Sequence, residues 1–371
     1  MKKTFEEIVL FARTGLNPRQ NFKLGQGHNK YITIKNIKNN TLVIDDNTDV
    51  VNDEAIRLIH KRSQIKKGDI LFASIGRMGD MYIIEEDPEG WDINESVFAF
   101  TLDTSIVRQK YFYYIFKVKS TLDYLVSNSS GSTFKSIKMN QLKKMVFDIP
   151  SLEEQDQIIE ALDKVDHVIA MRKQEICLLD ELIKARFVEM FGLVRNNVYG
   201  YKIKMLQDVC EPIKDGTHQT PTYVNDAQHG FKFLSSKDVT SGKINWSKIK
   251  YIPSDLHEEL YAKIKPKRGD ILLAKNGTTG VAAVVETDEI FDIYVSLALL
   301  RPIDMNSIYL WAAVNSADTK HQFDSSLKGI GVPNLHLGEI KKTKIIVPPL
   351  ELQNQFADFA TQVDKSKLSH K

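Results

Sequence analysis

The chain has 371 residues, of which 42% are hydrophobic, 9% aromatic and 26% charged. This length and apolar content suffice for two or three domains with buried cores. The formal net charge of +2 does not require a polyanionic partner, but it permits one where positive side chains cluster.

The N-terminus and the cysteines favour a cytoplasmic protein. Glu6 and Glu7 follow Met1 too early for a signal peptide. No apolar run approaches the roughly 18 residues that a membrane-spanning helix needs. The two cysteines, Cys177 and Cys210, form neither a disulfide framework nor a metal-binding cluster.

The first 150 residues combine strand-like runs with Gly- and Asn-rich turns. Helical spacing of apolar residues predicts a helix over 106–126, followed by a polar loop over 127–136. Alternating or apolar runs predict strands over 31–34, 41–44, 69–73, 81–84 and 144–149, with turns at 39–40 and 76–79.

One long helix is predicted over 152–191, where no Gly or Pro occurs. Ser151 and Glu154 form a capping box at its start, and Gly192 ends it. The helix would be about 60 Å long. Apolar side chains recur at steps of four and three, which is typical of a coiled-coil surface; they are Ile158, Leu162, Val165, Ile169, Ile176, Leu179 and Ile183.

After Gly192 the same order of parts begins again. The run from Gly68 to Gly79, GDILFASIGRMG, corresponds to GDILLAKNGTTG from Gly269 to Gly280. The helix start PSLEEQDQ at Pro150 corresponds to PPLELQNQ at Pro348. Two matches in nearly the same register indicate an internal duplication.

The duplication predicts an α+β protein built from two similar mixed α/β domains and two helices. The expected parts are a first domain (1–150), a long helix (151–192), a second domain (193–349) and a shorter second helix (350–371). Two copies of one fold are expected to pack about a pseudo-twofold axis, which makes the helices an antiparallel coiled-coil pair.

Catalytic motifs are nearly absent from the sequence. It has no phosphate-binding loop, no dinucleotide fingerprint and no histidine or cysteine spacing for a metal. One fragment, Asp324 with Glu339 and Lys341, loosely resembles the metal site of a nuclease. Its counterpart in the first domain, 141–143, has no carboxylate, so a solvated approach to a strand is the favoured interpretation.

Binding of a nucleic acid is better supported. Each domain has local clusters of positive charge, which can neutralise phosphates or simply keep a face soluble. The two glycine turns keep their glycines but differ in the residues between them, as expected for two readers of different bases or for simple divergence. The candidate DNA contacts from the clusters and turns are Ser74, Arg77, Lys135, Lys138, Lys237, Lys275, Asn276, Thr278, Thr279 and Lys328.

The sequence resembles the specificity subunit of type I restriction–modification systems. The matching features are the Gly-Asp-Ile-Leu runs, the Pro-Ser-Leu-Glu-Glu-Gln start of the long helix, and the opening of the second domain, Ile213 to Pro221, with His218 as a further candidate DNA contact. Residues 14–19 look like a variant of that opening.

The resemblance implies a non-catalytic, coiled-coil DNA-binding chain of a restriction system. Each domain would be a target-recognition domain that reads half of a bipartite target on double-stranded DNA. The helices would set the spacing and dock two methyltransferase subunits, joined by restriction subunits. S-adenosylmethionine for DNA methylation would bind those partners, so no cofactor is expected on this chain.

The second helix starts at Leu350 and would cover only the C-terminal half of the first. We expect the stripe Ile158, Leu162, Val165 and Ile169 to be covered by a methyltransferase helix or by a second copy of the chain. Two other functions remain open: a metal-dependent nuclease using Asp324, Glu339 and Lys341, and a coiled-coil adaptor that binds only protein.

Overall fold

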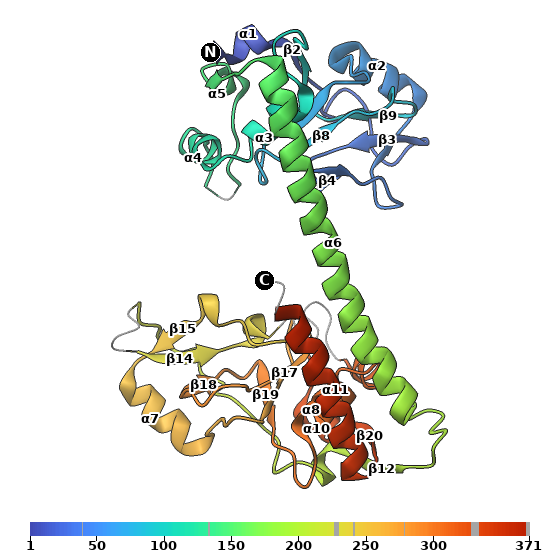
Figure 1. Ribbon diagram of the computed structural model, residues 1–371, viewed down its shortest axis with the longest axis vertical. Helices are drawn as coiled ribbons and strands as arrows, with labels where there is room; N and C mark the ends of the chain where they lie inside the picture. The colour runs from blue at the N-terminus through green and yellow to red at the C-terminus, as the bar shows by residue number, and fades with distance from the viewer. Residues whose placement is uncertain are drawn as a thin grey trace. The chain divides into compact units, whose positions relative to one another are not determined.

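The computed structural model describes residues 1–38, 40–132, 134–225, 230–239, 242–277, 279–327 and 334–368 (Figure 1). The chain divides into two compact units, Met1–Ala170 and Met171–Lys371, and the division falls within the long helix. Among the described residues, no helix is long and apolar enough to span a membrane.

A four-stranded antiparallel sheet forms the centre of the first unit. Its strands lie in the order β2 (Val9–Thr14), β10 (Val97–Leu102), β7 (Ile70–Ala73) and β8 (Met81–Ile83). All four residues of β7 are buried, since both faces of the strand are covered by apolar side chains. The predicted strands at 69–73 and 81–84 are therefore confirmed within one residue.

Smaller sheets flank this centre. One has the order β6 (Val50–Val51), β3 (Asn29–Ile32) and β9 (Trp91–Ile93), and β1 (Lys2–Thr4) pairs with β11 (Val146–Asp148), the last predicted strand. The strands predicted over 31–34 and 41–44 are shorter in the structure, where they overlap β3 and β5 (Thr41–Leu42). Strand β3 ends at Ile32, and a separate short hairpin joins β4 (Ile37–Lys38) to β5. Residue 39 of the predicted turn lies outside the described residues.

The helices of the first unit are α1 (Phe5–Ile8), α2 (Asp53–Ser63), α3 (Gln109–Ile115), α4 (Lys119–Ser127) and α5 (Met139–Leu142). The single helix predicted over 106–126 is wrong, because the chain breaks between α3 and α4. Phe116 packs against Phe72, Phe112 and Phe147 in the core, and Val118 takes an extended backbone as the N-cap of α4. Burial of one ring thus overrides the helical spacing.

Among the described residues, the second unit repeats three sheets of the first in the same strand orders, and the β4–β5 hairpin has no counterpart. The central sheet is β13 (Lys214–Asp215), β19 (Leu297–Leu300), β16 (Ile271–Ala274) and β17 (Ala282–Val284); the others are β15 (Lys250–Ile252), β14 (Phe231–Leu234) and β18 (Phe291–Ile293), and β12 (Lys202–Met205) with β20 (Lys344–Val347). The duplication predicted from the glycine runs is confirmed.

The helices of the second unit are η1 (Leu206–Asp208), η2 (Ser236–Asp238), η3 (Trp246–Lys248), α7 (Ser254–Lys263), α8 (Ser307–Val314), α9 (Ala317–Ser326), α10 (Leu337–Lys342) and α11 (Leu350–Leu368). Helices α7 to α10 of this unit repeat α2 to α5 of the first, whereas η2 and η3 have no helical counterpart among the described residues there. Each unit also contains a buried Asp bonded to a His of the flanking helix: His60 Nδ1 lies 3.1 Å from Asp92 Oδ2, and His257 Nδ1 lies 2.7 Å from Asp292 Oδ2.

The long helix α6 runs from Leu152 to Phe191, as predicted. At its start the backbone N–H and hydroxyl of Ser151 both donate to Glu154 Oε2, and the Glu154 N–H donates back to the hydroxyl, which completes the capping box. Gly192 follows with a φ of +71°. Both ends of the helix therefore form as the sequence predicts.

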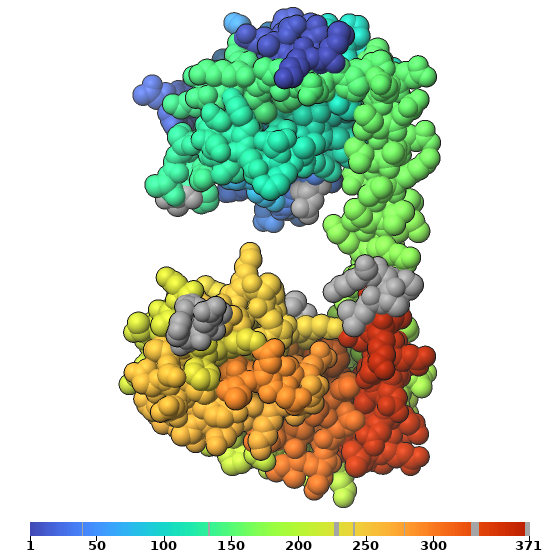
Figure 2. Space-filling model, turned by 60° about the vertical axis from the view of Figure 1, so that its left-hand side comes forward, coloured from blue at the N-terminus to red at the C-terminus, as the bar shows by residue number. Residues whose placement is uncertain are grey.

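The C-terminal part of α6 packs antiparallel to α11 within the second unit. Phe356 of α11 lies 5.5 Å from Phe187 and 5.7 Å from Phe191, measured between ring centroids. At the other end of α11, Lys367 Nζ contacts Asp180 at 2.5 Å. Figure 2 shows α11, in red, lying along the second unit. The predicted antiparallel pairing over the C-terminal half of the long helix is confirmed.

Candidate nucleic-acid interface

In the first unit, the glycine turn connects β7 to β8 at one end of the central sheet. Gly76 and Gly79 have φ values of +71° and +94°, which favour glycine. A Cβ on Gly79 would also lie 3.2 Å from Leu125 Cδ1 of α4. These two requirements explain why the glycines recur in both units while the residues between them differ.

The two glycines of the second turn have the same backbone features. Gly277 and Gly280 have φ values of +76° and +81°, and a Cβ on Gly280 would lie 3.1 Å from Phe323 of α9. The Gly280 N–H donates to the Ala274 carbonyl oxygen at 2.9 Å, as the Gly79 N–H does to that of Ala73 at 3.3 Å. The two turns are therefore equivalent frames for different side chains.

A second segment pairs with each glycine turn. In the first unit, the Gly76 N–H donates to the Lys135 carbonyl oxygen and the Ile137 N–H donates to that of Ser74, each at 2.9 Å. In the second unit, the Leu335 N–H donates to the Lys275 carbonyl oxygen at 2.9 Å. In the first unit the fold thus brings together the glycine turn and the segment that carries Lys135, which the sequence analysis named separately.

The predicted contacts of the first unit differ in exposure. Ser74 is buried, and its hydroxyl donates to the Ser96 carbonyl oxygen at 2.6 Å. Arg77 is about half exposed, donates from Nη2 to the Ile37 carbonyl oxygen at 2.8 Å, and lies 3.3 Å from Asp80. Lys135 and Lys138 are exposed. Of these four residues, only Arg77, Lys135 and Lys138 therefore offer exposed polar groups to a ligand.

In the second unit, Lys275 is buried and forms an ion pair with Asp215, which His218 Nε2 approaches at 3.5 Å. This pair ties the glycine turn to the opening loop of the unit. Asn276 is half-buried and Thr279 is buried, whereas His218 and Lys237 are exposed. Two further candidates, Thr278 and Lys328, lie outside the described residues.

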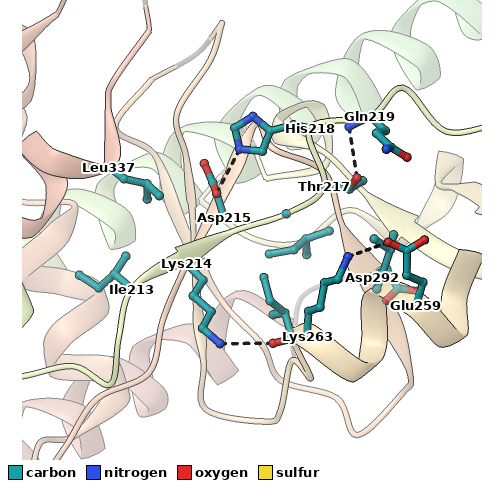
Figure 3. A pocket seen from close by; sticks show the side chains of 14 residues that line it. Ile213, Lys214, Asp215, Thr217, His218, Gln219, Glu259, Lys263, Asp292 and Leu337 are labelled. Atoms are coloured by element: carbon teal, nitrogen blue, oxygen red, sulfur yellow. Dashed lines mark hydrogen bonds and ion pairs between the residues drawn. The ribbon is translucent and has the colours of Figure 1, made fainter.

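A cavity of about 520 Å³ lies beside the opening loop of the second unit (Figure 3). Its charged groups are paired: Lys263 Nζ contacts Glu259 at 2.6 Å, and Lys214 Nζ donates to the Lys263 carbonyl oxygen at 3.4 Å. His218 and Gln219 stand at its margin. The cavity is thus lined by the opening loop over 213–219 and by residues of α7.

Sequence reasoning missed two exposed residues at the same end of the first unit. Phe134, directly before Lys135, is 70% exposed. Lys35 is also exposed, in the turn before Ile37, whose carbonyl oxygen accepts a hydrogen bond from Arg77. The duplication contained the signal for Lys35, since it aligns with Lys237, but Phe134 has no aromatic counterpart that could have indicated it.

Groups for metal chemistry are not assembled in the part of the chain that the structure describes. There, no three His, Cys, Asp or Glu side chains lie where they could hold a metal ion. Asp324 is half exposed on α9 and faces Lys320 at 3.8 Å, while Glu339 and Lys341 belong to α10. The nuclease alternative gains no support from this arrangement.

A duplicated α+β chain that presents an equivalent loop cluster in each unit is suited to binding a ligand at two similar sites. The model of the family "Type I restriction modification DNA specificity domain" matches residues 1–180 and 200–371. The chain belongs to this family and is a non-catalytic DNA-recognition subunit.

Other proteins resemble this chain in sequence and in fold. The MjaVIII type I restriction enzyme specificity subunit of Methanocaldococcus jannaschii is 21% identical over 85% of this chain and 77% of that protein. A putative specificity subunit of the same organism, MjaX, is 22% identical over 98% and 86%. The S subunit of a type I system from M. genitalium has the same fold, with a TM-score of 0.50 and 14% identity over all of this chain and 90% of that one.

Proposed function

We propose that this chain reads a bipartite DNA target, with residues 1–150 reading one half and residues 193–349 the other. The observation that carries the proposal is the matched loop cluster: the same end of the central sheet presents a glycine turn and a paired loop in each unit. The frames are equivalent and their side chains differ, as two readers of two half-sites require.

The proposed DNA face of the first unit consists of Arg77, Phe134, Lys135 and Lys138. Arginine can bond guanine in the major groove, lysines neutralise phosphates, and an exposed ring can contact a thymine methyl. Ser74 is left out of direct contact because its hydroxyl is buried and bonded. It positions the turn.

The proposed face of the second unit includes His218, Lys237 and Asn276, together with Thr278 and Lys328. Thr279 is left out of direct contact because it is buried. Buried Lys275 acts indirectly, because its ion pair with Asp215 holds the opening loop against the glycine turn. The amide of Asn276 has the donor and acceptor pattern that reads adenine in the major groove.

The helices are proposed to space the two readers and to dock the partner subunits. The stripe Ile158, Leu162, Val165 and Ile169 is 38%, 36%, 53% and 45% exposed in this chain. Covering four such side chains is worth on the order of 6 kcal/mol or less, since they are already partly shielded. We assign the stripe to a methyltransferase helix, with a second copy of this chain as the alternative occupant.

The methyltransferase subunits, two in the proposed complex, bring S-adenosylmethionine and the pocket that receives a flipped base. Restriction subunits would join the same core. Catalysis by the partner subunits is consistent with a recognition role for this chain, which belongs to a family of specificity domains.

Methylation mapping with the methyltransferase subunit present tests the proposal. The expected result is two short motifs at a fixed gap. Exchanging residues 1–150 for the corresponding domain of a relative should change one motif and leave the other intact. A single uninterrupted motif, or a change of both halves by one exchange, would contradict it.

A further inference from the structure

One side of helix α4 carries three exposed apolar side chains. Val118 at the N-cap, Leu122 and Val126 follow one another at steps of four, so they form a single ridge along the helix. They are 52%, 39% and 49% exposed, whereas Thr121 and Leu125 on the inner side are buried. Figure 1 shows α4 at the edge of the first unit. The three exposed residues define the α4 face.

The second unit shows that the fold does not require an apolar residue at any of these three positions. The equivalent helix, α9, lies 198 residues later in the chain, and its inner residues Thr319 and Phe323 are each 1% exposed. Its outer positions, which correspond to the α4 face, are all polar. They are Ser316, Lys320 and Asp324.

These polar residues stabilise α9 in ways that the α4 face cannot. The Ser316 hydroxyl accepts from the Thr319 N–H at 3.3 Å and so caps the helix. Lys320 Nζ lies 3.8 Å from Asp324 Oδ1. Val118 holds the equivalent N-cap position without a side-chain oxygen that could accept such a bond. The first unit therefore gives up a helix cap for exposed apolar side chains, which indicates that another surface covers them.

The covering surface is expected to meet the first unit only. A partner that binds both units alike would find apolar residues on α4 and polar residues on α9. A second copy of the chain meets the condition, because a twofold axis brings one patch of a protein against the same patch of the other copy. Such a contact needs a single self-complementary patch in each chain.

The charges beside the α4 face are self-complementary. Lys119 and Asp123 are the charged residues of α4, and they form an exposed ion pair of 2.6 Å. Consider an antiparallel pair of α4 helices whose twofold axis passes near Leu122. Val118 of one copy then lies near Val126 of the other, and the two lysines and two aspartates gather on one flank with no net charge.

We propose that the chain self-associates through the α4 face, as an antiparallel pair of α4 helices related by a twofold axis. A stable interface buries roughly 1,200 Å² or more, and two nine-residue helices bury less, so the association is weak and reversible. It joins two recognition chains through their first units. The inference does not depend on which residues contact DNA.

The first test gives the α4 face the residues of α9, as Val118→Ser/Leu122→Lys/Val126→Asp. This variant should fold, because the second unit uses the same residues on an equivalent helix, and circular dichroism checks that it does. Sedimentation velocity of the full chain measures self-association from roughly 1 to 200 µM, and the variant should associate at least about tenfold more weakly than the wild type. Leu162→Lys/Ile169→Lys, which changes the α6 stripe, should associate as the wild type does.

The second test reverses single charges and leaves the apolar residues in place. Lys119→Asp gathers acidic groups from both copies on one flank, and Asp123→Lys gathers basic groups, so each should weaken self-association by about threefold or more. An equimolar mixture of the two variants should associate more tightly than either alone, because opposite charges then alternate across the pair. Contact between two α4 helices predicts this recovery, and contact with a different protein does not.

Three results would overturn the inference: a wild-type chain that stays monomeric at every concentration, self-association that the α4 variant leaves unchanged, and a mixture of charge variants no tighter than its parts. Loss of methyltransferase binding in the α4 variant, with a monomeric wild-type chain, would assign the face to that subunit instead. DNA affinity and the methylated motif are separate measurements, so such a failure leaves the proposed function standing.

Discussion

Two glycines show how little room single positions have in this fold. Gly15 and Gly216 take equivalent places at the opening of each unit, and a Cβ on them would lie 1.7 Å from the Ile93 carbonyl oxygen and 1.9 Å from that of Ile293. Both neighbours are backbone atoms of β9 and β18, which cannot turn aside as side chains do. The opening loops are fixed by this close approach.

Gly216→Ala should therefore destabilise the second unit by about 3 kcal/mol, because backbone must shift to admit a methyl group. Urea unfolding of the full chain measures the change. The control is Gly338→Ala in α10, where nothing lies within 4 Å, and alanine should be neutral or stabilising by up to about 1 kcal/mol. Equal stability of the two variants would contradict the geometry.

The glycine turn of the first unit also sets a carboxyl pKa. Burial raises the pKa of Asp80, and the Arg77 guanidinium partly lowers it again. Because the folded pKa exceeds the unfolded one, this carboxyl contributes stability that is present at pH below the unfolded pKa and is lost as pH rises through the folded pKa.

Arg77→Met should raise the pKa of Asp80 further and extend that loss to higher pH. Carbon-13 NMR titration of the Asp80 carboxyl measures it. Arg57→Met, which removes an exposed arginine of α2, should leave the Asp80 pKa unchanged. An Asp80 pKa that does not move in Arg77→Met would show that the two groups are separated in solution.

Phe134→Ala tests the exposed ring of the proposed DNA face. At 70% exposure the ring adds little to stability, so the free energy of unfolding should change by less than about 0.5 kcal/mol. Binding of the target duplex should weaken by about 1 kcal/mol or more, because the ring is proposed to contact bases in the half-site that the first unit reads. Phe11→Ala, at a ring 59% exposed on β2, should leave DNA binding intact.

At the scale of elements, each of the two helices α6 and α11 is anchored at its start by one buried glutamine. Gln155 Oε1 accepts from the Arg108 N–H at 2.8 Å, and its Nε2 donates to the carbonyl oxygens of Ile106 and Pro150. Gln353 repeats this with the Asn306 N–H and the Pro348 carbonyl oxygen. These hydrogen bonds fix the first turn of each helix against its domain.

Gln155→Leu should lower the free energy of unfolding of the first unit by about 2–4 kcal/mol, because it leaves buried backbone groups without partners. Thermal and urea unfolding of the full chain measure this. Gln157→Leu, on an exposed side of the same helix, should change stability far less. Similar losses for both would mean that helix propensity, and not the anchor, determines the effect.

At the scale of the whole molecule, one apolar surface of α6 is exposed in the part of the chain that the structure describes. Helix α11 covers Ile183 and Phe187 in the second unit, whereas the stripe from Ile158 to Ile169 is exposed. We expect Leu162→Lys/Ile169→Lys to abolish methyltransferase binding and to leave the stability of each unit nearly unchanged, since a charge cannot be buried there without a partner.

Size-exclusion chromatography with the methyltransferase subunit, and sedimentation of the chain alone, measure the outcome. Met171→Lys is the control, because Met171 is 56% exposed on the same helix but outside the stripe. A wild-type chain that stays monomeric at high concentration and does not bind the methyltransferase through this stripe would contradict the assignment.

Local pattern was enough for the elements whose environment is periodic. The heptad spacing and capping box predicted α6 to the residue, and the repeated glycine runs predicted two copies of one fold. The same patterns failed where the contacts of a single side chain decide where an element ends. Phe116 breaks the predicted helix over 106–126 because its ring enters the core, and Asn36 ends β3 early by bonding Thr33.

The sequence by itself determined that this is a duplicated, two-domain recognition chain with a long helix, because repeats, glycines and heptads are local in the chain. Only the tertiary structure decided which candidates face outward. Ser74 and Lys275 look like ligand-binding residues in the sequence, but contacts with Ser96 and Asp215, distant in the chain, bury them. Exposure depends on such long-range contacts, and a pattern of neighbouring residues does not contain them.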